Sequence, residues 1–158
     1  MKKIIFLFLM FSAMLFAKWE VGTGYLTSGE PITTFTTYDL EESGSYIDIG
    51  VSVEYDISVF TIGHNLIKKG DPLYLIITDN EGNDINCQFY SDDVENREIR
   101  VPVKRSSILT KMLYNGKSAV LKYKYSDEIL AKFDLRGIKQ VMQKHVGSSY
   151  WYEYKLND

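Results

Sequence analysis

Cysteine and histidine, which supply thiolate nucleophiles, general bases and transition-metal ligands, are scarce in this 158-residue chain. It has one cysteine, Cys87, and two histidines, His64 and His145, which lie far apart and have no acidic or cysteine neighbour at metal-ligand spacing. No Gly-x-Ser-x-Gly elbow marks a serine nucleophile. The sequence therefore predicts structural roles for both histidines and assigns no catalytic residue. A hydrolase stays open as an alternative, because Ser-His-Asp triads assemble from residues distant in the sequence.

The acidic segment 79–84 is the best candidate for a metal loop. Asp79, Glu81 and Asn83 place side-chain oxygens at alternate positions, a spacing that suits calcium. However, Gly82 is the fourth residue of the loop rather than the sixth, and no bidentate glutamate follows at position twelve. We expect a hairpin turn here, keep the three oxygen ligands as a weak calcium candidate, and expect no cofactor.

Charge is distributed unevenly along the chain. Residues 18–90 contain 3 basic and 12 acidic residues, whereas residues 100–144 contain 11 basic and 3 acidic residues. A fold that interleaves the two regions would have a neutral surface; one that separates them would present a basic face to an acidic partner. Nucleic acid is not an expected partner, because the net charge is −3 and no nucleic-acid-binding motif occurs.

Candidate contact residues follow from this basic excess and from an aromatic run near the C-terminus. Lys122 and Lys124 lie on the polar side of an alternating segment, and Arg136 opens the segment after it. Trp151 and Tyr152 belong to the run Tyr-Trp-Tyr-Glu-Tyr, and such residues are frequent anchors of binding surfaces. We predict that these five residues contribute to one basic and aromatic surface for a protein partner.

The N-terminal residues are typical of a secretory signal peptide. Lys2 and Lys3 precede an apolar run that ends at Ala17, and that run is shorter than the roughly 20 residues that span a bilayer. We expect cleavage after Ala17 and no transmembrane segment in the mature chain, with an uncleaved anchor as the alternative. The predicted location is the bacterial periplasm or the exterior.

Cys87 cannot form an intramolecular disulfide, because it is the only cysteine. If its surroundings form a strand, Ile85, Cys87 and Phe89 share one face, and we expect that face to be the core. A buried, inert thiol is therefore predicted, with an intermolecular bond as the alternative.

Composition and periodicity predict one mainly β domain over residues 18–158. Hydrophobic residues make up 45% of the chain and charged residues 25%, as in ordinary globular proteins. Two short helices are expected late in the chain, one capped by Ser106 and Ser107, the other spanning 135–146 and ended by Gly147. We expect an antiparallel β-sandwich or curled sheet. The predicted strands cover residues 18–26, 32–40, 46–55, 57–63, 72–78, 85–90, 99–103, 119–125 and 129–135.

The order of elements from Val51 to His145 resembles two groups of periplasmic β-sandwich proteins. The matching order is a short helix, Gly116-Lys117, a strand, and the segment Phe133-Asp134-Leu135-Arg136-Gly137 before the last helix. It is similar to the type VI secretion accessory (TagO/VasI-like) and invasion-associated locus B groups. The resemblance implies a non-enzymatic envelope protein. Members usually carry cysteine pairs, so a disulfide-stapled version is excluded here.

Three functions are therefore considered. The first is an exported, non-enzymatic binding or accessory protein that supports assembly or interaction of a surface or secretion machine in the envelope. The second is a small secreted hydrolase acting on glycan or peptide, which needs a histidine or paired carboxylates in a cleft. The third is an inhibitor or immunity-type protein that binds one enzyme through a protruding loop such as 79–84.

Overall fold

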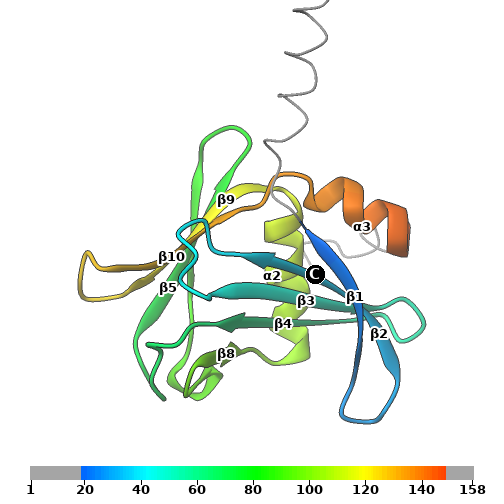
Figure 1. Cartoon of the computed structure of the whole chain (residues 1–158), viewed down its shortest axis with the longest axis horizontal. Helices are drawn as coiled ribbons and strands as arrows, with labels where there is room; N and C mark the ends of the chain where they lie inside the picture. The colour runs from blue at the N-terminus through cyan, green and yellow to red at the C-terminus, as the bar shows by residue number, and fades with distance from the viewer. Residues whose placement is uncertain (1–18, 149–158) are drawn as a thin grey trace, which may run out of the picture.

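The computed structural model describes residues 19–148, which form two antiparallel sheets and two α-helices (Figure 1). The strand orders are β1-β2-β3-β4-β8-β7 in the first sheet and β10-β9-β5-β6 in the second. The predicted mainly β, antiparallel fold with two helices late in the chain is confirmed. The expected signal peptide, residues 1–17, lies outside the described residues. The element bounds are β1 Glu20–Tyr25, β2 Pro31–Tyr38, β3 Tyr46–Ser52, β4 Ile57–Gly63, β5 Leu73–Asp79, β6 Asp84–Gln88, a 3-10 turn Ser91–Asp93, β7 Val94–Glu95, β8 Glu98–Arg100, α2 Val103–Tyr114, β9 Gly116–Tyr123, β10 Ile129–Asp134 and α3 Ile138–Val146.

Alternation in the first sheet follows the pattern expected for a sheet with one buried face. The odd-numbered positions of β3 face the core, and Ile47 and Ile49 are completely buried. In β4 the inward side chains are at even positions, including Phe60 and Ile62. β4 is a continuous strand paired with β3 along its whole length.

The second sheet contributes the other half of the core. Leu73, Leu75 and Ile77 alternate inward along β5, and Leu121 of β9 lies opposite Leu75. These side chains belong to the same buried cluster as those of the first sheet. Burial of apolar side chains from both sheets at roughly 1.5–3 kcal/mol each is the main force that holds the layers together. In Figure 1, β2 to β4 run across the picture and β5 runs upright at one side.

Helix α2 packs on β4 and begins earlier than its sequence indicates. Pro102, not a serine, stands at the N-cap position, and the expected strand ends at Arg100 instead of Val103. Proline at a helix start needs no donor and has a preset φ, so it begins the helix where a strand was predicted. The expected cap Ser106 is buried inside the helix, where its hydroxyl donates to the Val101 carbonyl at 3.1 Å.

Helix α3 begins three residues after the predicted start. Gly137 precedes it with φ of 89°, a left-handed conformation that favours glycine. Gly147 ends the helix as predicted. Ile138, Met142 and Val146 form its buried stripe, and His145 is exposed beside it.

Candidate functional site

Lys122 and Lys124 lie close together on the outer face of the second sheet. Lys122 is directly opposite Tyr74 in the β5–β9 register, and its ammonium lies 3.7 Å from the Asp127 carboxylate. The Asp127 carboxylate is fully exposed, so water screens this ion pair and it contributes little to stability. The alternation that buries Leu121 places Lys122 on the solvent side of the same strand.

Lys124 is the centre of an aromatic and polar cluster. The Lys124 Nζ lies 5.7 Å from the centre of the Tyr74 ring and 5.4 Å from the centre of the Tyr125 ring. It also donates a hydrogen bond of 3.1 Å to Gln88 Oε1. The backbone is fixed at this point, because the Lys124 N–H donates to the Pro72 carbonyl at 2.8 Å. Cation–π contacts orient the ammonium without neutralising it.

We call the surface formed by Tyr74, Gln88, Lys122, Lys124 and Tyr125 the lysine–tyrosine platform. Tyr125 is 78% exposed, so its ring is free to contact another molecule. The sequence indicated the two lysines but not the other three members. Tyr74 and Gln88 come from strands far from Lys124 in the chain, and only strand pairing brings them together.

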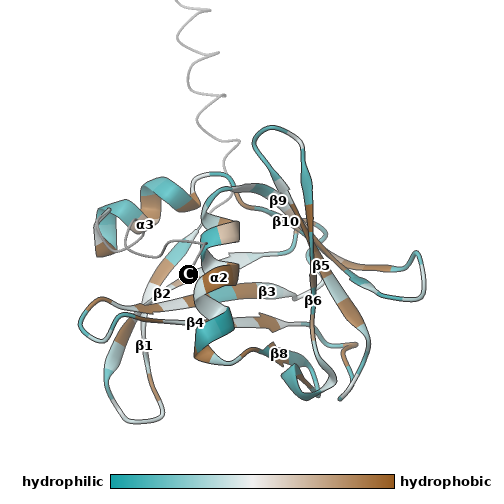
Figure 2. Cartoon of the chain, turned by 180° about the vertical axis from the view of Figure 1, so that it is seen from behind, coloured by the Kyte–Doolittle hydropathy of each residue, from teal (hydrophilic) through white to brown (hydrophobic). Residues whose placement is uncertain are grey.

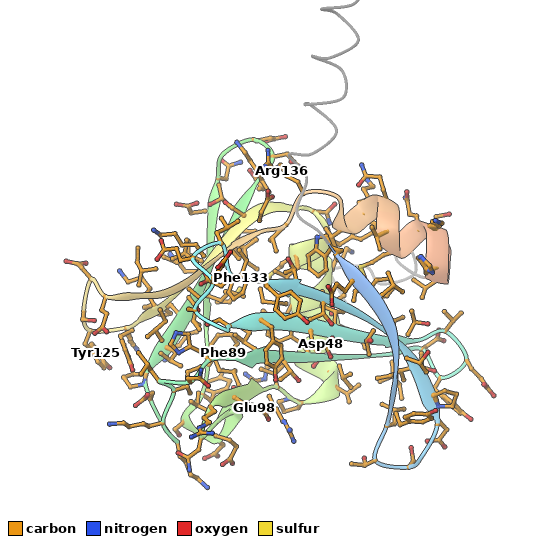
Figure 3. The ribbon with its side chains drawn as sticks, viewed as in Figure 1. Asp48, Phe89, Glu98, Tyr125, Phe133 and Arg136 are labelled. Atoms are coloured by element: carbon orange, nitrogen blue, oxygen red, sulfur yellow. The ribbon has the colours of Figure 1, made fainter. Side chains whose placement is uncertain are left out.

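Arg136 does not belong to this platform. It follows β10, whose last residue pairs with Ser118, whereas Lys122 pairs with Ile129 at the opposite end of the β9–β10 hairpin. Four residues of strand separate the two ends, about 13 Å. Figure 3 shows Tyr125 and Arg136 at different corners of the molecule. The structure therefore places Arg136 apart from the two lysines, and its part in a contact surface stays a prediction.

The guanidinium of Arg136 is already bound within the chain. Its Nε lies 2.9 and 3.0 Å from the two carboxylate oxygens of Asp134. Burial alone would raise the pKa of the Asp134 carboxyl, but the hydrogen bonds and charge of Arg136 outweigh burial and hold it below its usual value. Arg136 therefore braces the turn before α3. The other two predicted contact residues, Trp151 and Tyr152, lie outside the described residues.

The calcium candidate loop is a self-contained turn. Asp79 Oδ1 accepts hydrogen bonds of 2.8 Å from the N–H groups of Glu81 and Asn83, and Asp79 Oδ2 accepts one of 3.0 Å from the Asn83 amide. These bonds lower the pKa of the Asp79 carboxyl. No group of three His, Cys, Asp or Glu side chains that could hold a metal ion occurs within residues 19–148. The loop oxygens are thus occupied by the hairpin itself.

The two histidines have different surroundings. His64 is buried, with Nε2 3.0 Å from the Leu130 carbonyl oxygen and Nδ1 3.0 Å from the Leu66 N–H. Both ring nitrogens therefore make hydrogen bonds to the backbone that stabilise the fold. His145 makes an edge contact with the Phe35 ring, at 6.4 Å between centroids.

His145 also lines a cavity, which the hydrolase alternative would require. The cavity has a volume of about 330 Å³ and lies where β1, β2 and β3 meet α3. Ser52 and Glu54 line it as well, but neither makes a hydrogen bond to His145 in the part of the chain that is described. The Ser52 hydroxyl instead accepts the Tyr55 N–H at 3.3 Å. The geometry lacks the nucleophile–base contact that defines an activated serine.

A second cavity, of about 220 Å³, lies between β6 and α2, and we call it the edge groove. Cys87 is half-buried there rather than in the core, and its Sγ lies 3.5 Å from Met112 Sδ. Burial raises the pKa of the Cys87 thiol, so the inert state predicted for it has a physical basis although full burial is wrong. Ile85, expected in the core, is 38% exposed because β6 lies at the end of its sheet. The lining residues are Asn86, Cys87, Gln88, Phe89, Arg105, Ile108, Leu109 and Met112.

Comparison with protein-family models, with curated proteins and with solved structures gave no match for this chain. The resemblance to the envelope groups therefore stays an expectation. Within residues 19–148 no helix is both long and apolar enough to cross a membrane.

Proposed function

We propose that this chain is an exported, non-enzymatic binding protein of the bacterial envelope that supports assembly or interaction of a surface or secretion machine. The lysine–tyrosine platform is its contact surface for a protein partner. The export part of the proposal is supported by the sequence of residues 1–17, and the accessory role by the resemblance in element order. No cofactor takes part.

The arrangement of Lys124 is the observation that carries this proposal. Its ammonium is held by Gln88 and lies against two tyrosine rings, so a charged group and aromatic area are displayed in one fixed geometry. Tyrosine supplies large contact area at low entropic cost, and a fixed cation selects an acidic partner. Lys122, two positions before Lys124 in the chain, adds a second positive charge to the same face.

A crosslinking capture experiment from envelope extract tests the proposal. The double variant Lys122→Glu/Lys124→Glu should capture the partner at least about tenfold less well than the unchanged chain at low salt. The matched control is Lys68→Glu/Lys69→Glu, which makes the same charge change on an exposed turn. Capture by the unchanged chain should also weaken at high salt, because screening shortens the reach of exposed charges. Equal capture by both double variants at low salt would contradict the role of the platform.

Export is tested separately by cell fractionation. The full chain carrying a C-terminal tag should be recovered outside the cytoplasm at a mass that corresponds to cleavage after Ala17. Replacing Lys2 and Lys3 by Glu should retain it inside the cell, because the positive n-region is needed for export. Recovery of the unchanged chain in the cytoplasm at full mass would contradict export.

The cavity beside His145 supports a small hydrolase as a second candidate function. It places a histidine, a serine and a carboxylate around one space, although they are not hydrogen-bonded to one another. If hydrolysis of a peptide or glycan occurs there, His145→Gln should abolish turnover while leaving capture through the platform unchanged. Absence of turnover by the unchanged chain in a peptide and glycan screen would remove this candidate.

A further inference from the structure

β6 is an edge strand whose outward backbone groups have no partner in residues 19–148. In the β5–β6 pair, the Phe89 N–H donates to the Leu73 carbonyl and the Asp79 N–H to the Asn83 carbonyl. Because antiparallel pairs alternate, odd-numbered positions of β6 are bonded to β5 and even-numbered positions direct their N–H and C=O groups away from it. Asp84, Asn86 and Gln88 therefore present a free row of donors and acceptors.

Natural edge strands are usually protected by a proline, a bulge or an inward-pointing charge. β6 has the sequence Asp-Ile-Asn-Cys-Gln and contains none of these protections. Apolar side chains are exposed at this edge: Ile108, which lines the edge groove, is 44% exposed, and Ile85 of β6 is 38% exposed. Figure 2 shows α2 upright next to the sheet that contains β5 and β6. The surface combines unpaired backbone with an apolar groove, which is what an added strand requires.

The sequence of β6 is complementary to itself when two copies run antiparallel. With Asn86 opposite Asn86 of a second copy, the two side-chain amides can bond to each other. Ile85 then lies opposite Cys87, so apolar groups meet on the groove side. Asp84 lies opposite Gln88 on the outer side. About six backbone hydrogen bonds would form, because each of the three outward-facing pairs exchanges two.

Charge complementarity favours this same register. Gln88 Oε1 already accepts a hydrogen bond from Lys124, which leaves the Gln88 amide NH₂ to donate to another acceptor. In the register centred on Asn86, that acceptor is the Asp84 carboxylate of the second copy. A relay from Lys124 through Gln88 to Asp84 would form twice, once at each end of the paired strands. We therefore propose that β6 pairs with β6 of a second copy of this chain, giving a continuous eight-stranded sheet.

The proposed dimer places both lysine–tyrosine platforms on one face of the shared sheet. Ile85 and Cys87 of each copy enter the edge groove of the other, next to Ile108 and Met112. This inference goes beyond the proposed function and does not depend on it, since self-association needs no envelope partner. The groove could instead take an extended strand of another protein, an outcome that the following measurements identify.

Sedimentation of the full chain as a function of concentration tests the proposal. We expect a monomer–dimer equilibrium between about 1 µM and about 1 mM. Asn86→Pro should raise the dissociation constant at least about tenfold, because it removes the central N–H and blocks strand addition. The Asn86 N–H is not bonded to β5, so the melting temperature of the dilute variant serves as the control for folding. A monomer throughout the range, or a dimer that Asn86→Pro leaves unchanged, would overturn the proposal.

A disulfide experiment tests the register in which the two β6 strands are proposed to pair. Ile85→Cys puts a second thiol directly opposite Cys87 of the other copy. These two positions exchange no backbone hydrogen bonds, and the short distance between their Cα atoms suits a disulfide. Mild oxidation should give a covalent dimer on a non-reducing gel. The matched control is Ile85→Cys combined with Cys87→Ser, which removes the opposing thiol and should stay monomeric on the gel. Equal crosslinking of both variants, or none in either, would contradict the register centred on Asn86.

Discussion

The two edges of the four-stranded sheet differ in what covers them. At the β10 edge, the Leu40 N–H donates to the Lys132 carbonyl and the Lys132 N–H donates to Asp39 Oδ1, both at 2.8 Å. At the β6 edge, the equivalent groups of Asn86 have no bonding partner within residues 19–148. One edge is thus closed by the chain itself, and the other is left open beside an apolar groove. The difference indicates which edge stabilises the fold and which edge the proposed self-association would use.

Closure of the β10 edge depends on a buried carboxylate. Asp39 is 6% exposed and also accepts the Ser43 N–H at 3.1 Å. Burial alone would raise the pKa of the Asp39 carboxyl, but the hydrogen bonds from Lys132 and Ser43 outweigh burial and lower it. Asp39 follows β2, so this contact also joins the first sheet to the second.

Substitution by proline should have very different effects on stability at the two edges. Lys132→Pro removes an N–H that is bonded to Asp39 and distorts a covered strand, so we expect the melting temperature to fall by roughly 10 °C. Asn86→Pro removes an N–H that is directed to solvent, so we expect a fall of less than about 3 °C. Thermal unfolding of dilute protein, followed by circular dichroism, compares the two. Similar losses at both positions would show that the edges are not distinct.

Asp39 at the β10 edge and Asp79 in the turn before β6 both accept backbone hydrogen bonds, and replacing each tests the same contrast with a smaller expected effect. Asp39→Ala leaves the buried Lys132 N–H without an acceptor and should lower the free energy of unfolding by about 2 kcal/mol. Asp79→Ala removes an equally well bonded cap from the exposed 79–84 turn, where water replaces the lost bonds. We expect a much smaller change there, measured by urea unfolding. A greater loss from Asp79→Ala would place the weak point of the sheet at the β6 side.

Local periodicity predicted the strands but not the edges. β3 and β5 were predicted because inward and outward residues alternate within a few positions, which depends on the strand alone. The hydrogen bond between Asp39 and Lys132 joins residues 93 positions apart, and no local pattern predicts it. The same reason explains the error over Ile85 and Cys87. They alternate like core residues, but whether their face is covered depends on which strand lies last in the sheet.

The candidate site was predicted only in part, because the sequence shows local periodicity but not strand pairing. Lys122 and Lys124 share a face because they are two positions apart on one strand and the turn that follows it, so the sequence was sufficient. Arg136 was grouped with them by charge alone, and the structure places it at the opposite end of the hairpin. Tyr74 and Gln88 could not be predicted, because their contact with Lys124 arises from strand pairing.

The covered edge should also be the acid-sensitive one. The folded-state pKa of Asp39 is depressed, so its contribution is fully present above the unfolded pKa and is lost as the pH falls through the folded pKa. We expect stability to decline below about pH 4. Asp39→Asn should be less stable at neutral pH and should lose less on acidification. Urea midpoints measured between about pH 2 and pH 7 compare the two proteins. Parallel pH curves would contradict this role of Asp39.

The alkylation rate of the Cys87 thiol shows whether the β6 edge is open or covered, and it is measured without changing the sequence. Burial raises its pKa, and it lies against Met112, so alkylation by iodoacetamide should be about tenfold slower in the dilute native chain than in urea. If β6 pairs with a second copy, the groove closes and the rate should fall further as protein concentration rises. Cys87 in Asn86→Pro should show the first effect without the second. A rate in the unchanged chain that is independent of protein concentration would mean that the groove stays open and that β6 does not pair with a second copy.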